Sequence, residues 1–288
     1  MKSQVSSTML TLSNYISKAV ERDIPKKVTE RAKLHLVDTF AAMISGSRLE
    51  PGKMAIAYIK NMGGKPESGI IGTKIVTTAQ NAALVNGMFG HADETDDTHP
   101  PSLTHPGTSV VPSALAIAER GRLSGAELLR SVTLGYDVCS RILLSLKPMP
   151  YLRSGHHAGA TGQVFGAAAA AGSLLRLSPL QVRYMLSYTG QQTAGMYTMF
   201  RDPEHIEKAY AMGGMPAHNG LQAALMVKCG WTGVEDIFSG ERDFFTHLHL
   251  KNLIVMSYQM VWVSAMKCSE RPLSVGLLAA LFKGQCML

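Results

Sequence analysis

Three short stretches carry the pattern that begins a helix, and they constrain the fold more than any other feature of this sequence. They are TTAQ at 77–80, SGAE at 124–127 and SPLQ at 178–181, each followed by an apolar-periodic segment. When a Ser or Thr stands three residues before Gln or Glu at a helix start, the side chain of each residue can accept a hydrogen bond from the backbone N–H of the other. Because strand-like alternation is scarce, the repeated signal predicts an all-α protein.

The positions of these signals predict where the helices lie. We expect Thr77, Ser124 and Ser178 to be N-cap residues, and Gly121 and Gly230 to stop the helices before them. The best candidate for a short extended piece is ESGIIGT at 67–73. The predicted helices lie near 25–46, 77–91, 108–121, 125–145, 161–177, 179–195 and 216–229.

The composition indicates how these helices pack. The 288-residue chain is 46% hydrophobic, so it is long enough for one large domain or two smaller ones with a substantial core. It holds 27 glycines and long alanine-rich stretches, with only 7% aromatic residues. We expect helices that approach closely through small residues. The first 20 residues, poor in acids, allow two interpretations, a transit peptide or an ordinary first helix.

Charge and cysteine usage exclude several classes of partner. The formal net charge is +7, but the basic residues do not cluster with aromatic ones, so we expect no nucleic acid as a partner and favour a small anionic substrate. No apolar run is long enough for a membrane span. The four cysteines are far apart, without metal-site spacing. We expect a cytoplasmic protein, or a mitochondrial one if the source is a eukaryote.

The stretch HADETDDTHPPSLTHPG, residues 91–107, concentrates titratable groups in a chain whose charged fraction is only 17%. A solvated acidic loop is one interpretation. A metal site is a second, because His91, Asp93, Glu94 and Asp96 are ligand types, although their spacing matches no common site. The third is acid/base chemistry, in which carboxylates set the charge of nearby histidines and Thr98 donates a hydrogen bond.

Two further stretches carry candidate functional groups. GHHAG at 155–159 places His156 and His157 between glycines, where a histidine could transfer a proton or satisfy a nearby carbonyl. Adjacent side chains diverge, so the two rings are not expected to share one role. In EHIEKAY, Glu204 and Lys208 have the spacing of a surface ion pair, and the alternative is that Lys208 points inward to bind a carboxylate.

Taken in order, these stretches resemble the MmgE/PrpD family of 2-methylcitrate dehydratases, cis-aconitate decarboxylases and related epimerases. The resemblance rests on ETDDT with its flanking helices, on GHHAGATGQVFGAAAAAG and on EKAYAMGGMPAHNG, and it extends over residues 10–245. It implies a large helical domain covered by a smaller α/β lid, in a homodimer, with a lyase site that uses no metal or cofactor. Residues 1–245 would form the helical domain, and 246–288 a divergent tail in which the lid is absent or incomplete.

The resemblance also assigns roles to individual residues. Three departures from the family pattern leave the substrate open among small di- and tricarboxylates: Glu94 stands where many members carry Asp, Gly159 stands where a Thr is frequent, and the loop to His105 is one residue longer than in the decarboxylases. A non-catalytic remnant without its lid, and an isomerase or epimerase, remain as alternatives. The implied catalytic residues are His105, His157, Glu94 and Asp97, and the implied substrate-binding residues are Asp96, Thr98, Lys208 and His156.

Overall fold

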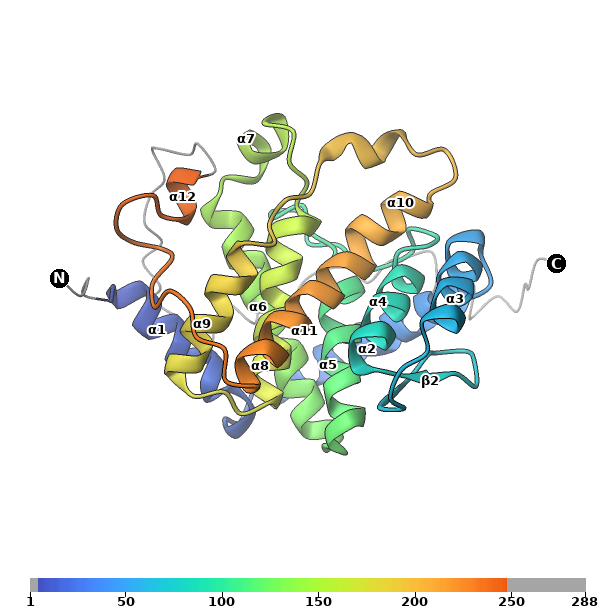
Figure 1. Ribbon diagram of the computed structural model, residues 1–288, viewed down its shortest axis with the longest axis horizontal. Helices are drawn as coiled ribbons and strands as arrows, with labels where there is room; N and C mark the ends of the chain where they lie inside the picture. The colour runs from blue at the N-terminus through green and yellow to red at the C-terminus, as the bar shows by residue number, and fades with distance from the viewer. Residues whose placement is uncertain (1–4, 248–288) are drawn as a thin grey trace.

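The computed structural model describes residues 5–247, and almost all of its regular structure is helical (Figure 1). The all-α prediction is confirmed for these residues, among which no α/β lid is present. No helix in this range is long and apolar enough to span a bilayer. The predicted tail lies, apart from Thr246 and His247, outside the described residues, so the boundary at 245 remains a prediction.

The helices follow one another along the chain with short connections. A two-stranded antiparallel sheet, β1 (Ser68–Gly69) and β2 (Val76–Thr77), interrupts them once and lies in the segment predicted to contain an extended piece. The helices are α1 (Ser7–Ser17), α2 (Lys26–Gly46), α3 (Glu50–Met62), α4 (Ala79–Gly90), α5 (Gly107–Gly121), α6 (Gly125–Ser145), α7 (Pro148–Arg153), α8 (Val164–Leu174), α9 (Pro179–Gly190), α10 (Ile206–Ala209), α11 (Met215–Lys228) and α12 (Phe244–His247).

The predicted helix starts are confirmed at two of three positions. Ser124 and Ser178 each form a complete capping box, with Glu127 and Gln181 as the reciprocal partners. The prediction of Thr77 as a cap is wrong by one residue. Thr78 caps α4 by accepting a hydrogen bond from the Asn81 N–H, while Thr77 belongs to β2. Thr77 and Thr78 both have a hydroxyl that could cap the helix. Thr77 pairs in the sheet, so Thr78 is the residue that caps α4.

The predicted helix ends also need correction in part. Gly230, with φ 98°, follows α11 as expected, since glycine adopts left-handed backbone without strain. Gly121 is instead the last residue of α5, and the left-handed position is Arg122. Helix α9 ends at Gly190, five residues before the predicted end. The predicted set lacks helix α3, which begins at Glu50 and has Pro51 in its first turn, where proline is tolerated.

Helix α8 is the centre of the core, and small residues allow its neighbours to approach it. Every residue of α8 is buried, and it packs against α5, α6, α9 and α11 (Figure 1). Gly135 of α6 and Gly166 of α8 face each other: a Cβ on Gly166 would lie 2.7 Å from the Gly135 carbonyl oxygen. The expectation of close contacts through small residues is confirmed here.

A second close crossing brings together the two segments that carry the acidic loop and Lys208. Gly87 of α4 lies against Gly213, which belongs to η4, a π-helical turn at Tyr210–Gly214 between α10 and α11. A Cβ on Gly87 would lie 2.6 Å from the Gly213 carbonyl oxygen. This crossing brings the end of α4, where the acidic loop begins, beside the segment that carries Lys208.

Candidate active site

Three of the predicted site residues line one cavity. Thr98 and His105 come from the loop between α4 and α5, and His157 from the segment before η2, a π-helical turn at Gly159–Gln163. Phe200 and Met212 are among the apolar residues of the wall. The cavity has a volume of about 210 Å³, so it can hold a small molecule. The loops that the sequence separates by about 60 residues therefore meet at one place.

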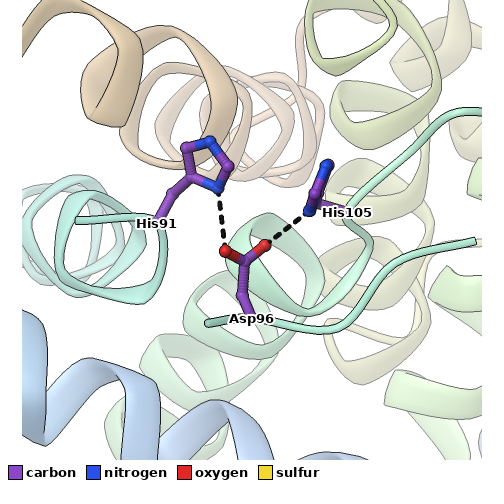
Figure 2. A group of neighbouring side chains, drawn as sticks. All are labelled: His91, Asp96 and His105. Atoms are coloured by element: carbon purple, nitrogen blue, oxygen red, sulfur yellow. Dashed lines mark hydrogen bonds and ion pairs between the residues drawn. The ribbon is translucent and has the colours of Figure 1, made fainter. Parts of the chain in front are cut away.

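Asp96 links His105, which lines this cavity, to a second histidine, His91 (Figure 2). One carboxylate oxygen lies 3.0 Å from Nδ1 of His91, and the other lies 2.8 Å from Nδ1 of His105. Because an ionised carboxylate only accepts hydrogen bonds, each ring carries a proton on Nδ1. Figure 2 shows that the second ring nitrogen of each histidine lies on the side away from Asp96.

The charges of these three residues follow from burial and from one another. Burial disfavours the carboxylate of Asp96, but the two histidines more than offset this and hold its pKa well below the usual value. Burial lowers the pKa of His91, and Asp96 only partly counters that effect. For His105, burial acts in the same direction, but Asp96 prevails and raises its pKa. His91 is therefore the neutral partner and His105 the one that holds a proton more readily.

His157 is neutral, and its tautomer is defined by a backbone contact. Burial, with smaller contributions from His156 and His91, lowers its pKa to about 4. Its Nδ1 accepts a hydrogen bond from the Ala160 N–H, so the ring proton must be on Nε2. That Nε2 is buried and has no hydrogen-bond partner among the described residues. His157 thus carries a buried ring N–H that has no hydrogen-bond partner among the described residues.

The two adjacent histidines diverge, as the sequence predicts. His156 stacks on Tyr151 at 5.1 Å between ring centroids, and its Nδ1 lies 2.9 Å from the Ser154 hydroxyl. It is half-buried, whereas His157 is 1% exposed. The backbone at residue 195 can lie against the His157 ring because residue 195 is glycine. A Cβ at that position would overlap Nε2 of His157.

Lys208 does not pair with Glu204, which corrects the surface ion pair that the i, i+4 spacing favours. Its ammonium group contacts the carboxylate of Glu94, from the acidic loop, and lies 4.8 Å from the centre of the Phe200 ring. Only 13% of its side chain is exposed. The side chain of Lys208 therefore points inward, and its binding of a substrate carboxylate remains a prediction. The chain turns at His205, whose φ is 62°, just before α10 begins.

Asp97 and Glu94 have different surroundings from Asp96. Asp97 is buried, accepts a hydrogen bond from the Gly107 N–H at the start of α5, and lies 2.9 Å from Nδ1 of His35 in α2. Gly107 has to be small, since a Cβ there would lie 2.7 Å from the Asp97 carboxylate. Asp97 thereby fixes the start of α5, two residues after His105. Glu94 is exposed and contacts Lys208 and His205.

Two groups of side chains here have metal-ligand types. They are His91, Asp96 and His105, and His91, Glu94 and His205, with candidate ligand atoms within 4.8 Å of one another in each group. In the first group, both Asp96 oxygens already receive ring N–H groups. A cation bound there would have to displace both protons. Hydrogen bonding is thus sufficient to explain how His91, Asp96 and His105 are arranged.

Several residues of the site were not singled out from the sequence. The sequence indicates His91 only as a candidate metal ligand, and it does not indicate His205, whose Nε2 donates to the His91 carbonyl at 2.9 Å. Gln163 was also missed: its side-chain oxygen accepts from the His105 N–H at 3.2 Å. A glutamine within an otherwise apolar run was the available signal for Gln163. For His205, the partner is 114 residues away and no local pattern indicates it.

Comparisons with known proteins agree with this architecture. A family model described as the MmgE/PrpD N-terminal domain matches residues 10–253. The chain is 30% identical over 227 residues to a cis-aconitate decarboxylase of Homo sapiens, covering 76% of this chain and 45% of that protein. It is 28% identical over 239 residues to the cis-aconitate decarboxylase-like protein oryM of Aspergillus oryzae (79% and 48%).

A cis-aconitate decarboxylase of Aspergillus terreus is 25% identical over 250 residues, which are 83% of this chain and 49% of the relative. The chain thus spans about half the length of the curated relatives that it matches. The family match covers most of the sequence and contains all the loops that meet at the cavity. The chain belongs to the MmgE/PrpD family.

Proposed function

We propose that this chain provides the acid/base portion of a lyase site that removes CO₂ or water from a small di- or tricarboxylate. The observation that carries the proposal is the cavity in which His105, held by Asp96, and His157, with its free N–H, both take part in the wall. Three relatives named for cis-aconitate decarboxylation support a substrate of that chemical class.

Both reactions need proton transfer beside a carboxylate. When CO₂ leaves, the electron pair of the broken C–C bond remains on carbon and has to receive a proton. When water leaves, a base removes a proton next to a carboxylate and an acid protonates the departing hydroxyl. In each case negative charge develops and has to be stabilised by nearby donors or cations.

The surroundings of the histidines support distinct roles. His105 has Nδ1 committed to Asp96, so its Nε2 is the atom that gives or takes a proton, and its raised pKa favours the acid form at rest. His157 is neutral and carries its proton on the unpaired Nε2, which suits it to stabilise a developing negative charge. Reversal of these two roles is the alternative within this proposal.

Substrate carboxylates need cations and donors, and Lys208 and Thr98 are the candidates. Thr98 is exposed in the cavity wall. Lys208 lies over Phe200, which lines the same cavity, and its contact with Glu94 could exchange for a substrate carboxylate. We assign Asp97 a supporting role at the start of α5, and His156 a place beside the cavity without direct proton transfer.

Three further parts of the proposal concern the metal ion, the oligomeric state and the cellular location. We propose a reaction without a metal ion, consistent with the hydrogen bonds that occupy both oxygens of Asp96. A homodimer in the cytoplasm or mitochondrion is also proposed, and it rests on the family resemblance.

One assay separates the possible reactions. The purified chain is mixed with 2-methylcitrate, citrate, cis-aconitate and an iminodicarboxylate, and the products are followed by NMR. We expect loss of CO₂ from cis-aconitate or loss of water from one of the citrates. Change of configuration in the iminodicarboxylate alone would indicate an epimerase. No reaction across the panel, with a folded sample, would contradict the proposal and favour a non-catalytic domain.

A further inference from the structure

His91 has no part in the roles proposed so far, yet it is one of the most constrained side chains near the cavity. It is the C-cap residue of α4 and is 1% exposed. Its Nδ1 donates to the Asp96 oxygen that His105 does not use, at 3.0 Å. Its Nε2 is buried and has no hydrogen-bond partner among residues 5–247. The side chain therefore makes a single polar contact, and that contact is to Asp96.

This contact determines how the Asp96 carboxylate is oriented. A carboxylate on a short side chain can rotate, and either oxygen could then approach His105. With one oxygen held by His91, the other is directed at Nδ1 of His105, 2.8 Å away. Because that oxygen accepts a hydrogen bond, the proton of a neutral His105 ring is placed on Nδ1 and its Nε2 remains available to the cavity.

His91 can hold Asp96 without competing for its charge. A neutral imidazole supplies one N–H donor and no positive charge, so the carboxylate keeps its full negative charge for His105. An Arg or Lys at the same place would pair with Asp96 and weaken that interaction. The low pKa that burial gives His91 is consistent with this division.

The position of His91 is itself fixed from the other side. Its carbonyl accepts a hydrogen bond from Nε2 of His205 at 2.9 Å, and the two rings lie 5.5 Å apart. The His91 ring also meets the His105 ring edge-on at 5.0 Å. Contacts from α4, from the acidic loop and from the segment before α10 thus converge on this one residue.

We propose that His91 is a positioning residue that orients Asp96 and thereby fixes the tautomer of His105, leaving Nε2 of His105 free for proton transfer. The catalytic part of this inference rests on the proposed lyase function. Its structural part, the tautomer of His105, can be measured whether or not the chain is active.

The test compares two substitutions in the full chain. In His91→Leu an apolar side chain of similar size removes the donor. In His91→Asn the side-chain amide replaces Nδ1–H as a donor to Asp96. Ring ¹⁵N NMR of histidine-labelled protein reports which nitrogen of His105 carries the proton. Kinetics with whichever panel substrate reacts report kcat and KM.

At a pH above the raised pKa of His105, where its ring is neutral, the wild-type spectrum should show His105 protonated on Nδ1, and His91 protonated on Nδ1 with a bare Nε2. His91→Leu should give a mixture of His105 tautomers and lower kcat about 10- to 100-fold, by analogy with the loss of a partner that orients a metal-ligating histidine. KM should change little, because His91 does not line the cavity. His91→Asn should restore the Nδ1–H tautomer and most of kcat.

Three results would overturn the inference. They are a wild-type His91 with its proton on Nε2, a His105 in His91→Leu that keeps a pure Nδ1–H tautomer, and an equal loss of kcat in both variants at equal folded fraction. If His91→Leu does not fold, the wild-type and His91→Asn spectra still decide the tautomer. A chain that turns over nothing but shows the expected tautomers would contradict the proposed function and leave the positioning role supported.

Discussion

At the scale of single residues, His157 makes the stability of the protein depend on pH. Its pKa is about 4 in the folded protein and near 6.5 when unfolded. Between these values the unfolded chain binds the proton and the folded one does not, so stability falls as pH falls from 6.5 to 4. The shift corresponds to about 3 kcal/mol of unfolding free energy.

His157→Asn should remove this dependence and also impair catalysis. The Asn oxygen can still accept the Ala160 N–H, but no Nε2–H donor remains. We expect the difference in unfolding free energy between wild type and variant to shrink by about 3 kcal/mol from pH 7 to pH 4, measured by urea denaturation. Turnover at pH 7 should fall about 10²- to 10⁴-fold. Parallel stability curves for the two proteins would contradict the assigned pKa.

The sequence identifies a site residue when the pattern that marks the residue lies within one short segment. Asp96, Thr98 and His105 lie within one polar segment, so charge density alone drew attention to them. His91 is the first residue of the same segment, but its proposed function depends on the direction of one ring nitrogen. His205 and Lys208 meet Glu94 across 111 to 114 residues. Such pairings depend on how α4 and α10 pack, which no local pattern specifies.

At the scale of secondary-structure elements, the crossing of α4 and η4 depends on two glycines. Gly87→Ala would place a Cβ 2.6 Å from a backbone oxygen that cannot move without displacing η4. We expect a loss of about 1–3 kcal/mol in unfolding free energy, as for other overpacked cores. Turnover should also fall, because α4 leads to His91 and η4 follows Lys208.

Gly125→Ala is the matched control for this crossing. Gly125 is the first residue of α6, and a Cβ there would meet nothing within 4 Å. Since alanine favours helix more than glycine, stability should stay equal or rise by up to about 1 kcal/mol. Chemical denaturation of both variants tests the pair. Equal effects would show that the α4–η4 contact is not a constraint.

Helix starts were predictable, whereas irregular turns were not. The capping boxes at Ser124 and Ser178 are contained within four residues each, so the sequence reveals them directly. The π-helical turns η2 and η4 each contain two glycines, but no local pattern in them specifies a π-helical turn. A tertiary contact joins the two turns: the Gln163 side-chain amide in η2 donates to the Met212 carbonyl of η4. These turns are where α8 and α11 begin beside the cavity.

At the scale of the whole molecule, the two ends of the described chain are tied together. The carboxylate of Asp236, beyond α11, accepts hydrogen bonds from the Ser6 N–H at 2.8 Å, the Phe238 N–H at 2.9 Å and the Ser239 hydroxyl at 2.7 Å. Ser6 is the N-cap of α1, which packs on α8 and α9. The first helix is thus held on the core by a residue 230 positions away.

Asp236→Ala should therefore weaken the whole fold rather than one loop. Losing three hydrogen bonds to a partly buried carboxylate should cost about 2 kcal/mol in unfolding free energy. Hydrogen exchange should accelerate in α1 as well as around residue 236. Asp23→Ala is the control: Asp23 is 97% exposed and pairs with Arg130 at the surface, where such pairs contribute little. If α1 exchanges at the same rate in both variants, the contact between Ser6 and Asp236 does not hold the first helix in place.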